Sequence, residues 1–149
     1  MKLPKRILLI LGIIFLLIQL FPVDRSIPEN TDPKKDFFAL VQAEPEMMTR
    51  IKASCYDCHS HESTYPWYSY VAPFSWIIQD HVNEGREHLN FSTWADYSHK
   101  EQMHKLEEAV EEIEKGEMPL KGYLTYHKEA RFDLDEKQEI LAFLNQLRR

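Results

Sequence analysis

The chain has 149 residues, with 18 Lys and Arg against 24 Asp and Glu, and a formal net charge of −6. This length fits one domain with a modest core and is too short for two packed domains. A hydrophobic fraction of 44% excludes a wholly disordered chain. The two Cys and four Gly exclude a disulfide-rich scaffold and a glycine-rich nucleotide loop.

The charge is unevenly distributed along the chain. The first 23 residues carry three basic side chains and no acid, so the remainder holds 15 basic and 24 acidic residues, a net of −9. Phosphate-backbone binding depends on Lys and Arg. The acidic body therefore predicts no binding to nucleic acid.

Residues 1–23 have the pattern of a membrane-targeting segment. Lys5 and Arg6 precede an apolar run from Ile7 to Val23, which is at the lower limit of about 17 residues for a transmembrane helix. The run ends in bulky residues rather than in a signal-peptidase site, which favours an uncleaved signal anchor over a cleaved signal and secretion. We expect the basic end to stay in the cytoplasm and residues 24–149 to lie on the exported, periplasmic side of a bacterial membrane.

The exported part divides into a linker and one domain. Residues 24–35 are mostly polar and contain Pro28 and Pro33, which predicts a linker. Residues 36–149 form the domain, which begins with a short apolar turn at 37–41. Sustained alternation of apolar and polar residues is missing, so we predict no strand and an all-α fold.

Helices are predicted from apolar spacing and capping residues. One begins at Pro45 and runs into the Cys55 region, and a second runs from Pro73 to about Leu89. The other two begin with capping-box pairs, Ser98 with Glu101 and Asp133 with Glu136, and Gly116 ends the first of these. Long loops are expected at 59–72 and 116–132.

The chemistry lies in Cys55-Tyr-Asp-Cys58-His59, the C-x-x-C-H signature of covalent haem attachment. Two thiols three residues apart on a helical turn suit addition to the two vinyl groups of one haem, and the adjacent imidazole suits the proximal position on iron. A thioredoxin-like pair needs a βαβ context, zinc needs a second ligand pair, and a plain disulfide does not call for His59. The motif therefore predicts one covalently bound haem c.

The second axial ligand of the iron is predicted to be Met118, in the loop Gly116-Glu-Met-Pro119. Proline holds the preceding backbone extended, and such a loop can present a thioether to a haem. Three other methionines (Met47, Met48 and Met103) lie in helical apolar stripes typical of core residues. His81 and His88, seven residues apart on one helix face, leave bis-histidine ligation open as an alternative.

These segments resemble the bacterial haem-binding domain family. The resemblance rests on five blocks of sequence: Ser54–Ser60, Tyr65–Tyr68, Ala72–Trp76 with His81, Gly85–Ser92 and Gly116–Leu120. It covers about residues 36–148 and implies a cytochrome c-like fold with haem c, usually anchored or exported. The family is defined by haem binding and not by a reaction.

Side chains around the motif have further expected roles. Five aromatic residues after the motif are expected to shield haem from water: Tyr65, Trp67, Tyr68, Tyr70 and Trp76. His61 departs from the Asn found in the family and is considered as an extra surface ligand. Four histidines are expected to be exposed or in loops, without an assigned role: His61, His99, His104 and His127.

The sequence thus predicts a mono-haem c-type cytochrome that transfers one electron at a time, with His59 and Met118 as iron ligands. It is expected to be a carrier and not an enzyme, with no identifiable small-molecule substrate. A run of glutamates from Glu107 to Glu117 is a candidate docking surface for a basic redox partner. The alternatives are a haem sensor or peroxidase-like enzyme with an open or labile iron site, and a haem-bearing tether for another complex.

Overall fold

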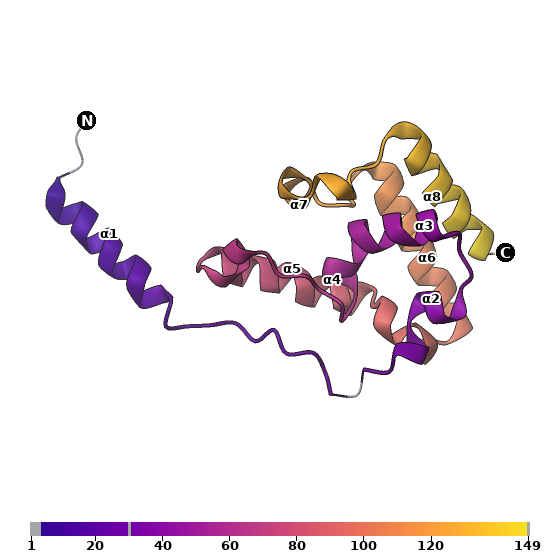
Figure 1. The fold of residues 1–149 in the computed structure, drawn as a ribbon, viewed down its shortest axis with the longest axis horizontal. Helices are drawn as coiled ribbons and strands as arrows, with labels where there is room; N and C mark the ends of the chain where they lie inside the picture. Colours follow the sequence, from indigo (N-terminus) through magenta and orange to yellow (C-terminus); the bar gives the residue numbers. More distant parts are fainter. Residues whose placement is uncertain (1–3, 30, 149) are drawn as a thin grey trace.

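The computed structural model describes residues 4–29 and 31–148, and all regular structure within them is helical (Figure 1). This confirms the predicted all-α class. The α-helices are α1 (Lys5–Ile18), α2 (Phe37–Leu40), α3 (Pro45–Ile51), α4 (Asp57–His59), α5 (Phe74–His88), α6 (His99–Lys115), α7 (Lys121–Tyr126) and α8 (Leu134–Leu147). Short 3₁₀ segments are η1 (Pro33–Lys35), η3 (Trp67–Tyr70), η4 (Phe91–Asp96) and η5 (Lys128–Ala130), and η2 (Lys52–Tyr56) is a π-turn.

Helices α6 and α8 begin as their capping residues predict. The Ser98 hydroxyl accepts from the Glu101 backbone N–H, and the Glu101 carboxylate accepts from the Ser98 N–H. Asp133 and Glu136 form the same reciprocal pair on α8. Gly116 follows the last turn of α6 at φ 74°, a left-handed conformation that favours glycine.

Helices α6 and α8 lie side by side and run in opposite directions (Figure 1). Their facing stripes supply half of the main core, and the other half comes from α2, the motif helix and the segment after α5. Burial of these apolar side chains is the main favourable term in folding. The buried residues of this core are Phe37, Ile51, Tyr56, Leu89, Phe91, Trp94, Leu106, Val110, Ile113, Ile140, Leu141 and Leu144.

An aromatic cluster joins the motif helix to the start of the domain. The Phe37 ring centroid lies 5.1 Å from that of Phe91 and 5.0 Å from that of Trp94. Tyr56, inside the C-x-x-C-H motif, stacks on Phe91 with ring centroids 5.0 Å apart. The motif is therefore held by core packing on the side of Tyr56.

The two long loops that the sequence predicts contain helical segments. η3 lies within residues 59–72, and α7 and η5 lie within 116–132. None of the three has a side-chain N-cap hydrogen bond, so they lack the capping signal that identifies α6 and α8. Their conformation depends on tertiary contacts, which local sequence patterns do not encode.

α1 is the helical part of the segment predicted to span the membrane, residues 1–23, of which the structure describes residues 4–23. α1 has 14 residues, a length of about 21 Å against a hydrocarbon core of about 30 Å. No helix in the described part of the chain has the length and apolar character needed to cross a membrane. Pro22 disfavours helical backbone at the residue before it. The Gln19 side chain bonds both to the Phe15 carbonyl within α1 and to the backbone of Ala72.

The segment expected to be a linker makes contacts with the domain. Thr31 lies 2.8 Å from the His61 ring, Oγ1 to Nδ1, and Lys35 pairs with Asp96 at 2.6 Å. Residues 19–25 contact the amino-terminal end of α5, so the segment follows the domain surface beneath α5 in Figure 1.

Candidate functional site

The two cysteines and His59 lie near the end of a helical segment that runs from Pro45 to His59. α3 continues through the π-turn η2, which carries Cys55, into α4, which carries Cys58 and His59. The segment ends at Ser60, where the backbone becomes extended. A π-turn inside a helix is frequently found at a functional site.

Both cysteines are free and partly buried. Burial raises the pKa of the Cys55 thiol to about 12 and that of Cys58 to about 11, with the neighbouring thiol adding to the first and Asp57 to the second. Both are therefore neutral thiols at neutral pH. Redox-active cysteines are recognised by a lowered pKa, so this environment does not suit thiol–disulfide exchange.

The His59 ring is oriented by a backbone carbonyl. Its Nδ1 lies 3.0 Å from the oxygen of Leu89, just beyond α5. A carbonyl only accepts, so Nδ1 carries the proton. Burial lowers the pKa of His59, which favours the neutral ring. The lone pair is then on Nε2, for which the described residues provide no hydrogen-bond partner; histidines that bind metals are commonly oriented in this way.

Helix α5 packs against the motif through a glycine. A Cβ added at Gly85 would lie 2.8 Å from the backbone oxygen of Cys58 and 3.2 Å from its Cβ. This position therefore permits the close approach that brings the Leu89 carbonyl to His59. Leu89 lies four residues after Gly85, and its backbone N–H donates to the Gly85 carbonyl at 2.9 Å.

Arg86 caps the carboxyl end of the motif helix. Its Nε donates to the Ser60 carbonyl at 2.8 Å, and Nη2 donates to the Ser63 hydroxyl at 3.0 Å. Carbonyls at a helix end lack helical partners, and a cation there satisfies both the hydrogen bond and the helix dipole. Gly85 and Arg86 thus hold the motif helix at two points, the backbone of Cys58 and the carbonyl of Ser60.

His61 lies in a loop, one of the two expected placements, but it is buried and is therefore not the surface ligand considered. The Asn90 amide nitrogen lies 2.9 Å from Nε2 of His61 and donates to it, because the Asn90 oxygen already accepts from the Ser92 N–H. Nδ1 then carries the proton and donates to Thr31, whose hydroxyl donates to the Pro28 carbonyl. Both ring nitrogens are occupied.

Met118 lies after Gly116 on the loop between α6 and α7, as predicted. It is partly buried and packs against the same core cluster as Cys55. Its backbone N–H donates to the Glu112 carbonyl at 3.2 Å, which holds the loop close to the end of α6. The contacts of the described residues do not join Met118 to His59, so its role as a ligand stays a prediction.

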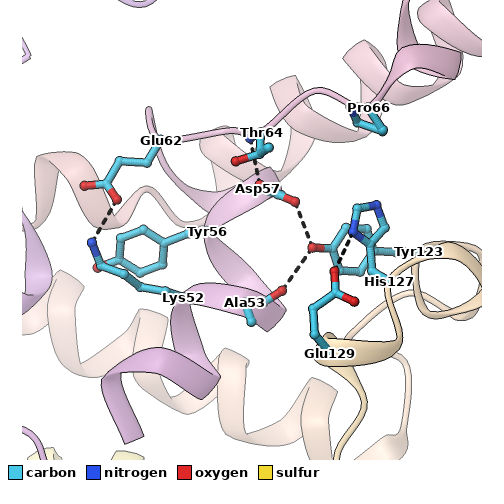
Figure 2. Close-up of a pocket in the computed structure, with 10 residues that line it drawn as sticks. All are labelled: Lys52, Ala53, Tyr56, Asp57, Glu62, Thr64, Pro66, Tyr123, His127 and Glu129. Atoms are coloured by element: carbon cyan, nitrogen blue, oxygen red, sulfur yellow. Dashed lines mark hydrogen bonds and ion pairs between the residues drawn. The ribbon is translucent and has the colours of Figure 1, made fainter. Parts of the chain in front are cut away.

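Tyr123 is a site residue that the sequence analysis missed. Its hydroxyl lies 2.8 Å from Oδ2 of Asp57 and 3.0 Å from the Ala53 carbonyl, both on the motif helix (Figure 2). Burial and the Asp57 carboxylate raise the pKa of Tyr123. α7 is therefore fastened to the motif five residues after Met118. A tyrosine in an expected loop carries no sequence signal for this contact.

His127 lies between α7 and η5, outside regular helix as expected, but its side chain is largely buried and packs on Tyr123. Its ring stacks on Tyr123 with centroids 4.1 Å apart, and its Nε2 lies 3.0 Å from the Tyr68 hydroxyl. Tyr123 and His127 border a cavity of about 370 Å³ on the Ala53 and Asp57 side of the motif (Figure 2).

The two histidines considered as alternative ligands, both in the described part of the chain, have no hydrogen bond to the motif, although His88 lies close enough to His59 to contribute to its lowered pKa. His81 and His88 are exposed on α5. Trp67 and Tyr70, expected to shield haem, are 79% and 62% exposed near the amino-terminal end of α5, the end opposite Leu89. Among the described residues, no group of three or more His, Cys, Asp and Glu could hold a metal ion by itself.

These features define a class of protein: an all-helical domain whose donor set, two free thiols and a neutral imidazole with an available Nε2, suits haem. The family comparison agrees. The model of a family described as a haem-binding domain matches residues 13–146, and the chain belongs to this family. Haem is therefore the cofactor of this domain. Searches of curated proteins and of solved structures found no match.

Proposed function

We propose that this protein is a mono-haem c-type cytochrome that carries single electrons on the exported side of a bacterial membrane. The observation that carries the proposal is the His59 ring, which directly follows the cysteine pair. Its Nδ1–H is held by Leu89 and its Nε2 is left for iron. Haem iron supplies the one-electron couple between the ferrous and ferric states.

The two cysteines attach the cofactor in this proposal. Each S–H adds across one vinyl group, so that sulfur bonds to one carbon and the hydrogen goes to the other, with no net oxidation. The neutral, partly buried thiols of Cys55 and Cys58 suit a structural link better than a redox reaction. One such motif in the chain implies one haem c.

His59 and Met118 are the proposed axial ligands. Support for Met118 comes from its partly buried position against the cluster that also contacts Cys55, and from Tyr123, which fastens the following helix to the motif. His/Met ligation favours the higher end of haem potentials. Retaining both ligands in both oxidation states would minimise rearrangement during transfer.

The electron partner would be a separate protein, because we propose a single haem per chain. α6 presents a row of exposed glutamates that could steer a basic partner. Part of this charge is compensated within the chain, since Lys115 pairs with Glu111 and Glu112 and Arg148 pairs with Glu107. The exposed members of the row are Glu107, Glu108, Glu111, Glu114 and Glu117.

Membrane attachment is proposed through the apolar segment around α1. All its described side chains avoid the core, and a helix that is apolar on every side needs an apolar environment. The basic residues before it would stay on the cytoplasmic side, which leaves the domain on the exported side where covalent haem attachment takes place.

The attachment is tested with the full chain expressed in a host that matures c-type cytochromes. We expect haem to remain on the polypeptide in a denaturing gel and to be lost from it in Cys55→Ser/Cys58→Ser. Ser54→Ala, a neighbouring substitution on the same helix, is the matched control and should keep covalent haem. Covalent haem that persists in the double serine variant would refute the proposal.

The carrier function is tested by absorption spectroscopy of the purified holoprotein. A low-spin ferric spectrum with a Met–iron charge-transfer band supports electron transfer with two protein ligands. A high-spin ferric spectrum, with rapid binding of cyanide or carbon monoxide, would contradict it and favour a sensor or peroxidase-like enzyme.

A further inference from the structure

The segment from Tyr65 to Gln79 is uncharged, although 28% of the chain is Asp, Glu, Lys or Arg. Its large side chains are nevertheless exposed: Trp67 by 79%, Tyr70 by 62% and Phe74 by 57%. Trp76 and Ile77, in the first turn of α5, are also exposed, by 38% and 52%. We call these five residues the aromatic face. An exposed apolar patch of this kind commonly marks an interaction surface.

The aromatic face is joined to the end of α1 by hydrogen bonds. The Gln19 side chain accepts from the Ala72 N–H at 2.9 Å and donates to the Ala72 carbonyl at 3.1 Å. The Trp76 indole N–H donates to the Phe21 carbonyl at 2.9 Å. In Figure 1 the end of α1 lies on the same side of the domain as the start of α5.

Arg25 makes a third attachment. Its guanidinium donates to the Ser69 carbonyl and lies 4.5 Å from the Tyr70 ring centroid and 5.4 Å from that of Tyr65. Cation–π contact and the hydrogen bond hold this charge against the domain. The segment after α1 is therefore fixed to the domain at residues 19, 21 and 25.

The apolar surface of α1 continues into the aromatic face. α1 buries none of its residues, and Leu20 and Phe21 beyond it are 71% and 67% exposed. A medium that covers the end of α1 therefore also reaches the neighbouring Trp76, whose indole N–H bonds to the Phe21 carbonyl. Trp and Tyr, with a polar group on an apolar ring, are the residues enriched at membrane–water interfaces.

The α5 part of the aromatic face is distant from Cys58. Phe74 lies eleven residues before Gly85, which contacts Cys58; this corresponds to about 16 Å along the helix. Trp67, on η3, lies nearer to the motif, because its ring contacts Tyr68, whose hydroxyl lies 3.0 Å from Nε2 of His127. The α5 residues of the aromatic face and the contact with Cys58 thus lie at opposite ends of α5.

We infer that the aromatic face lies in the head-group region of the same lipid bilayer that holds α1. This inference rests on the proposed membrane attachment and goes further, because it sets the orientation of the domain. The amino-terminal end of α5 faces the lipid, and the motif points outward along α5. The cofactor is then held at a set height above the bilayer and does not move on a free tether.

Tryptophan fluorescence of the full-length holoprotein tests this orientation. The chain has three tryptophans; Trp67 and Trp76 are on the aromatic face, and Trp94 is 4% exposed in the core. The protein is reconstituted in phosphatidylcholine–phosphatidylglycerol vesicles with or without bromine on the acyl chains. Quenching by haem is common to both preparations and cancels in the ratio.

We expect the brominated lipid to quench the tryptophan fluorescence of the wild type, and to quench that of Trp67→Phe and of Trp76→Phe less. The double variant keeps only Trp94, and its fluorescence should be the same in brominated and unbrominated vesicles. Equal quenching of the wild type and the double variant, in protein that sediments with the vesicles, would overturn the inference and leave membrane attachment standing. A protein partner or second copy covering the face would give this result. Protein that fails to sediment with vesicles would instead overturn the attachment itself.

Discussion

The backbone of Gly85 lies directly on Cys58, so close that a Cβ at residue 85 would be 2.8 Å from the Cys58 carbonyl oxygen. The contact joins the C-x-x-C-H motif to the last turn of α5. It also places Leu89 so that its carbonyl meets the His59 ring. Packing and ligand orientation therefore depend on the same interface.

Gly85→Ala is expected to destabilise the domain by about 1–3 kcal/mol, the usual cost of forcing an additional carbon into a packed interface. The fraction of chains with covalent haem should fall as well, because α4 and α5 must separate. Urea unfolding and haem content per chain measure the two effects. Gly122→Ala on α7 is the control, since a Cβ there has no atom within 4 Å. Equal behaviour of the two variants would contradict the proposed packing role.

Tyr123→Phe is expected to lower the free energy of unfolding by about 1–2 kcal/mol, because it removes a hydrogen bond to a carboxylate and leaves the Asp57 Oδ2 without this donor. Amide hydrogen exchange in α7 should accelerate. Tyr126→Phe is the matched control, since that side chain is 71% exposed. If α7 exchanges at the same rate in both variants, Tyr123 does not fasten it to the motif.

Met118→Ala is expected to abolish the Met–iron charge-transfer band and to lower the reduction potential, because loss of a thioether ligand disfavours ferrous iron. Absorption spectra and redox titration of the holoprotein test this. Met103→Ala, another partly buried methionine that packs on the core, should retain the band. A band that survives in Met118→Ala would show that the distal ligand is another residue, with His81 and His88 the first to replace.

Asp36 gives a pH-dependent prediction. Its Oδ1 accepts from Phe38 N–H and the Tyr56 hydroxyl, while its buried Oδ2 has no hydrogen-bond partner among the described residues. Burial raises the pKa of Asp36 above its ordinary value of 3.8. The folded state thus takes up this proton first as pH falls, so the wild type should gain stability relative to Asp36→Asn between the raised pKa and about pH 3.8.

Urea unfolding of both proteins from neutral pH to about pH 3.5 measures this difference. Asp80→Asn, an exposed carboxyl on α5, serves as the control and should show no such trend. If the difference in free energy of unfolding between the wild type and Asp36→Asn stays constant over this pH range, the assignment to Asp36 is contradicted.

The sequence predicted those parts of the fold that have local causes. Ser98, Asp133 and Gly116 mark helix ends because the capping groups lie within three residues of the backbone atoms they satisfy. The contacts of Tyr123 and His61 were not predicted, because they join residues that are far apart in the sequence. Their partners lie 66 residues away at Asp57 and about 30 residues away at Thr31 and Asn90, and one tyrosine or histidine carries no mark of such a contact.

The candidate site divides in the same way. The cysteine pair and His59 were recognisable from their spacing, which the chemistry of attachment requires. The carbonyl that selects the ring tautomer belongs to the backbone of Leu89. Any residue type at this position could supply it, so the sequence carries no mark of the contact. Gly85 was visible only as part of a family-like block, and its steric role appears once α5 is placed against Cys58.

The π-turn from Lys52 to Tyr56 affects the direction in which the side chains of the motif project from the helix. A π-turn accommodates one more residue than an α-helical turn, and each residue of an α-helix corresponds to a rotation of about 100°. Cys58 and His59 therefore sit out of phase with the apolar stripe of α3 that ends at buried Ile51. Shortening the turn by one residue would rotate the thiols and imidazole about the helix axis while leaving every chemical group intact. The length of this turn therefore sets the direction in which Cys58 and His59 project from the helix.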